Sequence, residues 1–377
     1  AVESLAADYL QTVLLSQNPT WKILPQQTYK DGPFEARTDF LVFQPESNSY
    51  DLFEVKSATS PDKKDAFDVA YQYLILQHQI KIDRVFILHL NKEYVRANNQ
   101  LDLTQLFIAD DFTELVIGLL PEIAGLRDEA LDAADAPSAL DLPHCLAPKD
   151  CPCPNLCHPN LPEFSIYDIP RLSAKKKAEL LDLGIQDARQ IPENFGLNSK
   201  QQLVVERAKT NTEYINLTAL KTEIDKLQFP LWFLDYETCI CAIPRFDGYH
   251  PQQQVVFQYS LHKLGVLKSE PHHKGFIAID EGDPSLILLK QLSEDLGELG
   301  NVIVWNKAFE MTMNREMAKL HPEYAEFLEN LNSRIYDLGE IVNQGIYLHP
   351  RFKGSWSIKN VLPVMVPELS YENLPIN

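Results

Sequence analysis

Hydrophobic and polar residues follow helical or strand-like periods over most of the N-terminal half. Apolar residues recur at helical spacing over residues 3–15 (ESLAADYLQTVLL), which predicts an amphipathic helix. Residues 38–43 and 50–55 predict two strands, separated by a turn that contains Pro, Ser and Asn. Residues 65–80 predict a second helix, and residues 84–90 (RVFILHL) predict a buried strand. This mixture of elements predicts an α/β (α+β) fold.

The pattern changes twice further along the chain. Residues 130–162 show little periodicity and are rich in Ala, Asp, Pro and Cys, which indicates a boundary. A series of short helices follows, in which residues 166–185 resemble two helices joined by a turn and closed at Gly184. Strands are then predicted at residues 230–235, 255–264 and 301–305. We therefore expect an α/β domain over 1–142, a cysteine-rich segment over 143–162, a helical linker over 163–225 and a second α/β domain over 226–377.

Composition places the chain among ordinary globular proteins. Its 377 residues suffice for two or three domains, and 45% of them are hydrophobic, which allows sizeable cores. No run of apolar residues approaches the length of a membrane span, and the first residues lack the pattern of a signal peptide. We therefore expect a cytoplasmic location and no membrane partner. The sequence does not indicate an oligomeric state.

The formal net charge of −19 argues mildly against a nucleic-acid partner, because contacts to phosphate need Lys and Arg. Two effects weaken this objection. Metal sites built from carboxylates raise the number of acids and carry cations that the formal charge omits. A local basic groove can also lie on an acidic surface. Nucleic acid therefore stays among the expected partners.

Asp39 is followed, fifteen residues later, by Glu54-Val55-Lys56. Glu54 and Lys56 are two apart on a predicted strand, so their side chains share one face. Two carboxylates can hold a hard cation such as Mg²⁺, which activates water and neutralises charge on a phosphate. Gln72 follows on a predicted helix, between two tyrosines. The alternative for so short a pattern is a solvated Glu54–Lys56 pair on a sheet surface.

This set resembles the PD-(D/E)XK superfamily, and within it the RecB-like and CRISPR-associated exonucleases. The Gln-containing helix is similar to the one that packs beside the site in RecB-like nucleases. The resemblance implies a restriction-endonuclease-like fold for the N-terminal domain and catalytic roles for Asp39, Glu54, Lys56 and Gln72. It also implies that Asp39 and Glu54 bind Mg²⁺ or Mn²⁺.

Four cysteines, Cys145, Cys151, Cys153 and Cys157, lie close together in the segment that lacks periodicity. Four clustered thiolates can bind zinc or an iron–sulfur cluster. The resemblance to RecB-like nucleases implies a [4Fe–4S] cluster, for which relatives supply one N-terminal cysteine and three that follow the nuclease core. No cysteine precedes Cys145, so either that ligand is missing from this sequence or Cys153 replaces it. We expect an iron–sulfur cluster first and Zn²⁺ as the alternative.

A second acidic motif follows the apolar strand near residue 235. Asp235 and Glu237 share one face of that strand, and Glu310 lies on a helix after a later strand, in the pattern Asn306-x3-Glu310. These residues resemble the first two motifs of DnaQ-type (DEDD) exonucleases, which have an RNase H-like fold. The resemblance implies that Asp235, Glu237 and Glu310 are catalytic acids that bind metal ions.

Two departures from the DnaQ pattern affect this second site. Glu310 stands where those enzymes have Asp, and no final Tyr-x3-Asp or His-x4-Asp follows it in the sequence. Asp337 matches the non-catalytic Asp that is commonly found between the motifs. We therefore expect the second site, and with it the C-terminal domain, to be incomplete in this chain.

Other stretches resemble an uncharacterised bacterial family that carries a domain of unknown function at its C-terminus, a resemblance that covers nearly the whole chain. They are residues 86–107, 243–246, 257–262 and 354–359. The last stretch, GSWSIK, could present backbone amides or Lys359 to a phosphate, although an ordinary turn would explain it equally well.

The sequence therefore predicts a metal-dependent nuclease that hydrolyses phosphodiester bonds, with DNA favoured over RNA as substrate. Roles in repair or in defence against foreign nucleic acid follow by family analogy alone. The alternative is a catalytically incomplete module that uses nuclease folds to bind nucleic acid or a protein partner. A purely structural protein would require both acidic constellations to be accidental.

Overall fold

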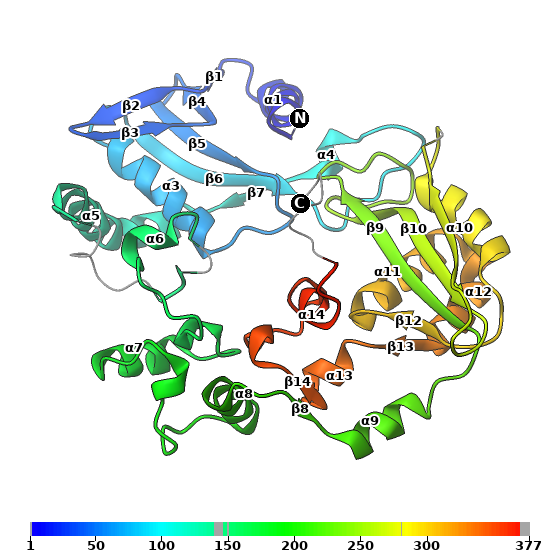
Figure 1. Ribbon diagram of the computed structural model, residues 1–377. Helices are drawn as coiled ribbons and strands as arrows, with labels where there is room; N and C mark the ends of the chain where they lie inside the picture. The colour runs from blue at the N-terminus through cyan, green and yellow to red at the C-terminus, as the bar shows by residue number, and fades with distance from the viewer. Residues whose placement is uncertain (1, 139–145, 149–150, 280, 370–377) are drawn as a thin grey trace. The chain divides into compact units, whose positions relative to one another are not determined.

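A computed structural model describes residues 2–138, 146–148, 151–279 and 281–369 (Figure 1). The expected mixture of helices and strands is confirmed. Contacts within the chain divide it into two compact units. The first unit comprises Ala1–Asp135, Glu237–Phe257 and Ala278–Ile287, and the second comprises Ala136–Tyr236, Gln258–Ile277 and Leu288–Asn377. Within the described ranges, no helix is both long enough and apolar enough to cross a membrane.

The first unit is built on a five-stranded sheet of mixed orientation. Its strand order is β1 (Lys22–Pro25), β4 (Phe40–Gln44), β5 (Ser49–Lys56), β6 (Ile82–Leu90) and β7 (Phe107–Asp111). The central pair, β5 and β6, is parallel, and the other neighbours are antiparallel. A parallel pair needs a crossover connection, and α3 (Lys63–Leu76) supplies it.

Apolar residues alternate between the two faces of this sheet, and each face is covered. On one face, Leu41, Leu52 and Ile87 pack with residues of α3 and α5 (Thr113–Asp135), next to the hairpin β2 (Thr28–Asp31) and β3 (Phe34–Arg37). On the other face, Phe40 and Phe53 pack with residues of the N-terminal helix and of α4 (Leu103–Leu106). Burial on both sides explains the apolar run over residues 40–43 of β4 and the adjacent apolar pair Leu52 and Phe53 of β5.

The expected N-terminal helix is present, but a π-helical stretch interrupts it, which the helical spacing of apolar residues does not predict. It consists of α1 (Val2–Tyr9), a π-helical stretch over Leu10–Leu14 and α2 (Leu15–Gln17). The segment Glu237–Phe257 joins the first unit through backbone contacts with the loop after β6. Arg96 donates its backbone N–H to the Tyr249 carbonyl, and its guanidinium donates to the carbonyl oxygens of Pro244 and Arg245.

The second unit contains a five-stranded sheet with the order β11-β10-β9-β12-β13. These strands are β11 (His272–Ile277), β10 (Gln254–Leu264), β9 (Leu231–Ile240), β12 (Val302–Val304) and β13 (Ile335–Asp337). The end of β9 and the start of β10 belong to the first unit. β12 is parallel to both β9 and β13, and helices α10 (Pro284–Asp295), α11 (Lys307–Leu320) and α12 (Ala325–Ser333) occur between the strands.

Short helices make up the rest of the second unit, and those between residues 163 and 225 agree with the sequence prediction. They are α6 (Pro154–Cys157), α7 (Ala174–Asp182), α8 (Ser199–Thr210), α9 (Leu217–Ile224), α13 (Glu340–Asn343) and α14 (Ile358–Met365), with 3-10 turns at Ile166–Asp168, Ala188–Gln190, Pro322–Tyr324 and Pro350–Phe352. Two short strands, β8 (Tyr214–Ile215) and β14 (Tyr347–Leu348), pair antiparallel. Ile166, Leu180 and Val205 belong to a small core of their own.

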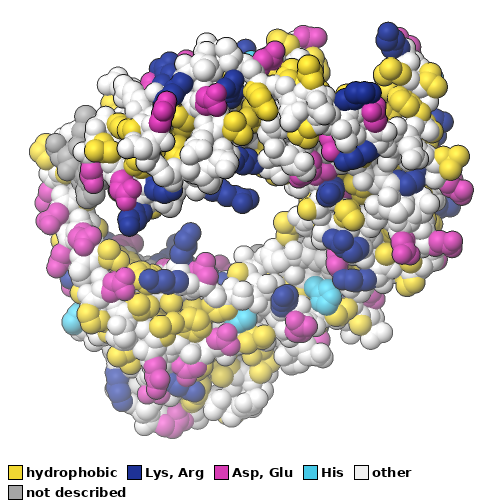
Figure 2. All heavy atoms as spheres, turned by 90° about the horizontal axis from the view of Figure 1, so that it is seen from below, with side chains coloured by type: hydrophobic (Ala, Val, Ile, Leu, Met, Phe, Trp, Pro, Cys, Tyr) yellow, Lys and Arg dark blue, Asp and Glu magenta, His cyan; other side chains and the backbone are white. Residues whose placement is uncertain are grey.

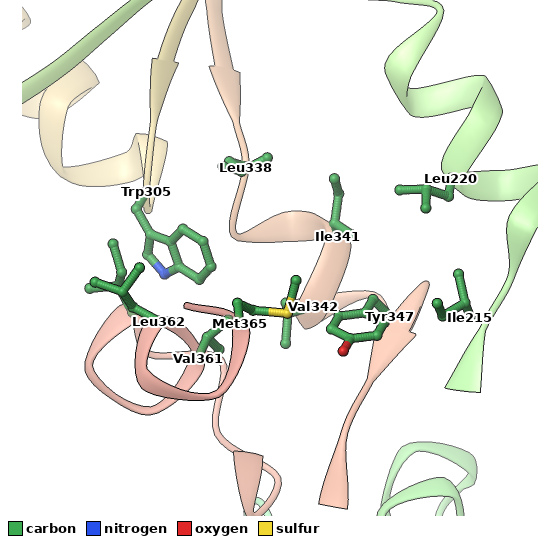
Figure 3. Close-up of a pocket in the computed structure, with 11 residues that line it drawn as sticks. Ile215, Leu220, Trp305, Leu338, Ile341, Val342, Tyr347, Val361, Leu362 and Met365 are labelled. Atoms are coloured by element: carbon green, nitrogen blue, oxygen red, sulfur yellow. The ribbon is translucent and has the colours of Figure 1, made fainter. Parts of the chain in front are cut away.

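An apolar pocket of about 480 Å³ lies within the second unit (Figure 3). Its walls come from the end of β12, from α9, from α13 and from α14, and Trp305, Leu338, Tyr347 and Met365 are among the side chains that line it. Because its walls carry almost no polar atoms, this pocket offers packing surface and no group that could orient a reacting molecule.

Candidate functional site

The four residues predicted for the N-terminal site come together at the ends of β4 and β5. Lys56 Nζ lies 3.0 Å from Glu54 Oε1, so both side chains lie on one side of β5, as predicted. From α3, Gln72 donates a hydrogen bond of 2.8 Å from Nε2 to Glu54 Oε2. Asp39 lies just before β4 and accepts the backbone N–H of Val55 at Oδ2, 2.8 Å away.

Strand pairing and a helix cap produce this arrangement. β4 and β5 pair antiparallel with Phe40 opposite Phe53, so Asp39 reaches the backbone beside Glu54. α3 begins at a capping box, in which Asp62 accepts the N–H groups of Lys64 and Asp65 while Asp65 accepts the N–H of Asp62. The cap fixes where the helix starts, and helical spacing then places Asp65, Asp68 and Gln72 on one face.

Lys56 is held by three carboxylates. Besides Glu54, its Nζ lies 2.6 Å from Asp68 Oδ2 and 3.8 Å from Asp65 Oδ1. Burial alone would lower the pKa of Lys56, but its hydrogen bonds to Asp68 and Glu54 outweigh burial and raise that pKa above its ordinary value. Lys56 is therefore a fixed cation at neutral pH and is unsuited to act as a general base.

Glu54 is the most perturbed acid of the first unit's site. Only 8% of the residue is exposed. Burial first, and the charge of Asp39 second, raise the pKa of Glu54 to about 7, although Gln72 and Lys56 donate hydrogen bonds to it. The pKa of Asp39 is also raised by burial, against the hydrogen bond from Val55. Two acids in this situation favour either a proton or a bound cation.

The oxygen atoms of Asp39 and Glu54 are suitable donors for Mg²⁺ or Mn²⁺. No group of three or more His, Cys, Asp or Glu that could hold a metal ion occurs in the described part of the chain. Mg²⁺ commonly needs only one or two carboxylates, because water and substrate phosphates complete its octahedral coordination. The Asp39–Glu54 pair therefore fits a cation that is shared with a phosphate-bearing substrate.

Sequence reasoning missed several neighbours of this site. Gln26 donates to Asp39 Oδ1 at 3.4 Å and also to Glu3, a residue of α1 whose charge raises the pKa of Asp39. Asp65 and Asp68 were likewise not predicted as partners of Lys56. The acidic spacing within α3 could have indicated Asp65 and Asp68, whereas no local pattern points to Glu3 or Gln26.

In the second unit, Glu310 is a buried acid with a raised pKa. It lies on α11, only 3% of it is exposed, and its Oε2 has no hydrogen-bond partner among the described residues. Burial, followed by the charges of Asp235 and Asp337, raises the pKa of Glu310 to about 7. Asp235 occupies an exposed position of β9, and Glu237 follows two residues later at another exposed position of that strand.

Asp337 has a structural role in the second unit. At the end of β13, its Oδ1 accepts the N–H groups of Asn306 and Gly339, and its Oδ2 accepts that of Lys307, at 2.9–3.0 Å. These bonds hold the first turn of α11, which carries Glu310. Because its carboxylate is occupied by backbone amides, Asp337 suits the non-catalytic position to which the sequence assigns it.

The predicted cysteine site is only partly described. Cys145 lies outside the described residues, and Cys151, Cys153 and Cys157 are free thiols. The Cys153 N–H donates to Cys151 Sγ at 3.4 Å. His158, directly after Cys157, is buried, and its Nε2 has no hydrogen-bond partner among the described residues. Metal binding by this segment stays a prediction.

Part of the chain matches a known family model. Residues 232–357 match the family described as "Domain of unknown function (DUF2779)". The matched region contains Asp235, Glu237, Glu310 and Asp337. It agrees with the expected resemblance to an uncharacterised family and by itself assigns no activity. Searches of curated proteins and of solved structures returned no match.

Proposed function

We propose that this protein is a metal-dependent nuclease whose active site is formed by Asp39, Glu54, Lys56 and Gln72 in the first unit. The observation that carries the proposal is the hydrogen-bonded set around Glu54, in which a buried carboxylate, a fixed ammonium and an amide converge beside Asp39. The substrate is a nucleic acid, with DNA favoured over RNA, and the reaction is hydrolysis of a phosphodiester bond.

Each side chain has a distinct task in this reaction. Asp39 and Glu54 would hold Mg²⁺ or Mn²⁺, which supplies activation of water and neutralisation of phosphate charge when bound. Gln72 fixes the rotation of the Glu54 carboxylate through Oε2, and the Val55 N–H orients Asp39. Lys56 stays protonated and stabilises the negative charge that develops on the phosphate.

The finer fold assignment belongs to the same proposal. The mixed sheet of the first unit, with α3 as the crossover between parallel β5 and β6, supports a PD-(D/E)XK restriction-endonuclease-like domain. The strand order β11-β10-β9-β12-β13, together with the acids Asp235 and Glu237 on β9 and Glu310 on α11, supports an RNase H-like, DnaQ-type domain. The Cys145–Cys157 segment would carry an iron–sulfur cluster or, as the alternative, Zn²⁺.

The second domain, by contrast, is proposed to contribute little cleavage in this chain. No Asp follows Asp337 within these 377 residues, so the proposed site rests here on the three acids Asp235, Glu237 and Glu310. Asp235 and Glu310 still concentrate negative charge, which favours weak binding of a single cation. A two-metal mechanism needs ligands for both ions, roughly 4 Å apart, and three acids do not supply them.

The proposal is tested with labelled single- and double-stranded DNA and RNA, in the presence of Mg²⁺, Mn²⁺ or EDTA. We expect cleavage that requires metal, that disappears in Glu54→Gln and that persists in Glu122→Gln, a matched change at an exposed residue of α5. Cleavage that survives Glu54→Gln and is lost in Asp235→Ala would place the active site in the second unit instead. Binding of nucleic acid without any cleavage would support the alternative of a binding module.

A further inference from the structure

A cationic hollow lies in the second unit and shares no residue with either acidic site. It has a volume of about 330 Å³ and lies between the loop that contains Pro170, the helix α7 and the turn after Phe352. Its walls carry three cations, Arg171, Lys177 and Lys353, and one carboxylate, Asp168. The lining therefore has an excess of positive charge, in a chain whose acids outnumber its basic residues by 53 to 34.

The two loops that carry Arg171 and Lys353 are packed closely against each other. Gly354 has a φ of +68°, and a Cβ atom placed on it would lie 2.7 Å from Pro170 Cδ and 2.9 Å from the Asp168 carbonyl oxygen. Arg171 and Lys353 themselves adopt left-handed backbone conformations, with φ of 52° and 50°. Such conformations persist only where the surroundings enforce them, so the positions from which both cations extend are fixed.

Among the described residues that line this hollow, Asp168 is the one carboxylate and faces three cations. Asp168 already accepts the N–H of Ser165 at 2.9 Å, as part of a helix cap. Lys177 donates to the Leu146 carbonyl at 2.9 Å, which fixes its ammonium without neutralising it. Arg171 and Lys353 are exposed and form no ion pair with a described carboxylate. Burial, and then the charge of Arg171, lower the pKa of neighbouring Lys200.

A local excess of positive charge is compatible with the net negative charge of the chain as a whole. On the face drawn in Figure 2, Lys and Arg side chains are interspersed with Asp and Glu, so the surface drawn is not uniformly acidic. Cations gathered in a concave site repel one another, and an anion that binds among them relieves this repulsion.

We propose that this hollow binds a phosphate group. A guanidinium such as that of Arg171 can donate two parallel hydrogen bonds to a phosphate, and lysines add point charges. Ser355 also lines the hollow; its Oγ accepts the Ser357 N–H, so its own O–H is available as a donor. The phosphate belongs either to a nucleic-acid backbone or to a free nucleotide or phosphate ion. The site shares no residue with the proposed nuclease centre, and this proposal does not depend on that centre.

The test measures binding without cleavage. A fluorescein-labelled single-stranded oligonucleotide is titrated with the full chain carrying Glu54→Gln, in EDTA, and inorganic phosphate is titrated separately by calorimetry. Arg171→Gln and Lys353→Gln remove one charge each and keep the aliphatic stem. Lys175→Gln, at an exposed position of α7 outside the lining, is the control with the same change in net charge.

We expect each hollow variant to weaken binding about tenfold, the effect of losing one charge-assisted hydrogen bond, and the control to weaken it by less than about twofold. Calorimetric binding of inorganic phosphate that depends on Arg171 would identify a free phosphate as a sufficient ligand. Binding of the oligonucleotide alone would identify the nucleic-acid backbone.

The proposal is overturned if neither probe binds, or if Lys175→Gln weakens binding as much as Arg171→Gln and Lys353→Gln do. Circular dichroism of each variant separates loss of binding from loss of folding. Lys353→Arg should retain binding, because it keeps the positive charge that Lys353→Gln removes. Phosphate binding by a chain that never cleaves nucleic acid would refute the nuclease proposal and leave this site intact.

Discussion

Glu54 carries a proton or a cation according to pH. Its buried carboxyl has a pKa of about 7, well above the ordinary 4.5, and Gln72 and Lys56 hold both oxygens in place. A proton on Glu54 blocks metal binding, because a metal ligand must be deprotonated. Below neutral pH the protonated form prevails, and above it the site presents two carboxylates to a cation.

Affinity for Mg²⁺ should therefore rise as the pH increases through about 7, where the proton on Glu54 ceases to compete. Calorimetric titration with Mg²⁺ between about pH 6 and about pH 8 measures this dependence in the wild type. In Glu54→Gln, the steep part of the pH dependence should vanish along with most of the affinity. An affinity that stays constant over this range would show that Glu54 is not the titrating ligand.

Glu310 should make the metal-free second unit less stable as the pH rises. Its folded-state pKa of about 7 exceeds the ordinary 4.5, so the folded chain holds the proton more tightly than the unfolded chain does. Its favourable contribution is complete below pH 4.5 and is lost as the pH rises toward 7. Glu310→Gln should therefore raise the free energy of unfolding at about pH 8 by on the order of 1–3 kcal/mol.

Urea unfolding in EDTA at pH values above and below this window measures the effect. Glu329→Gln, at an exposed residue of α12, is the control and should change stability little at either pH. A Glu310→Gln variant that is less stable than the wild type at high pH would mean that the ionised carboxylate is stabilised by contacts that its burial does not suggest.

Two elements, β5 and α3, supply most of the proposed active site. The strand places Glu54 and Lys56 on one face, and the helix brings Gln72 and Asp68 against them. The position of α3 depends on its capping box at Asp62, which satisfies backbone N–H groups that no helical carbonyl can reach. The cap thus connects a local sequence feature to the geometry of the site.

Asp62→Ala should lower the free energy of unfolding by about 1 kcal/mol, the usual cost of losing an N-cap side chain. The midpoint of urea unfolding measures the change. Asp62→Asn keeps an acceptor at the same place and should retain most of the stability. Equal losses in the two variants would indicate that charge, and not the hydrogen bonds of the cap, accounts for the effect.

Gly300 is required where the chain enters β12. It has a φ of +85°, and a Cβ on it would lie 1.9 Å from the carbonyl oxygen of Pro230, a backbone atom that cannot rotate away. Gly300→Ala should therefore destabilise the fold by about 2–4 kcal/mol, through strain and a backbone shift. Gly118→Ala, in the open middle of α5, has nothing within 4 Å of the added atom and should be neutral or slightly stabilising. Thermal unfolding of both variants compares them directly.

At the scale of the whole molecule, the cysteine segment is the proposed site of a further cofactor. The segment is poor in apolar residues, and Cys151, Cys153 and Cys157 are free thiols. Protein purified without oxygen should contain iron and should absorb light at about 400 nm, as iron–sulfur proteins do. Zinc without iron would favour the alternative of a zinc site. Protein without either metal, prepared in this way, would contradict both.

The sequence by itself determined the elements and the local pairings of the first unit's site. Alternation along β5 placed Glu54 beside Lys56, and helical spacing placed Gln72 on the following helix, because side-chain direction repeats every two residues in a strand and every 3.6 in a helix. The strands over residues 230–235, 255–264 and 301–305 were predictable for the same reason. These features depend only on neighbours along the chain.

The tertiary structure alone decided burial and the contacts between distant residues. It brought Glu3 and Gln26 to Asp39, and it buried Glu54 and Glu310 so that each titrates near neutral pH. It also packed Gly354 against Pro170, which formed a cationic hollow from segments that are far apart in sequence. The spacing of residues along the chain does not encode these contacts. The pKa of a carboxyl depends on its burial and on the charges near it, and both are set only when distant segments come together in the fold.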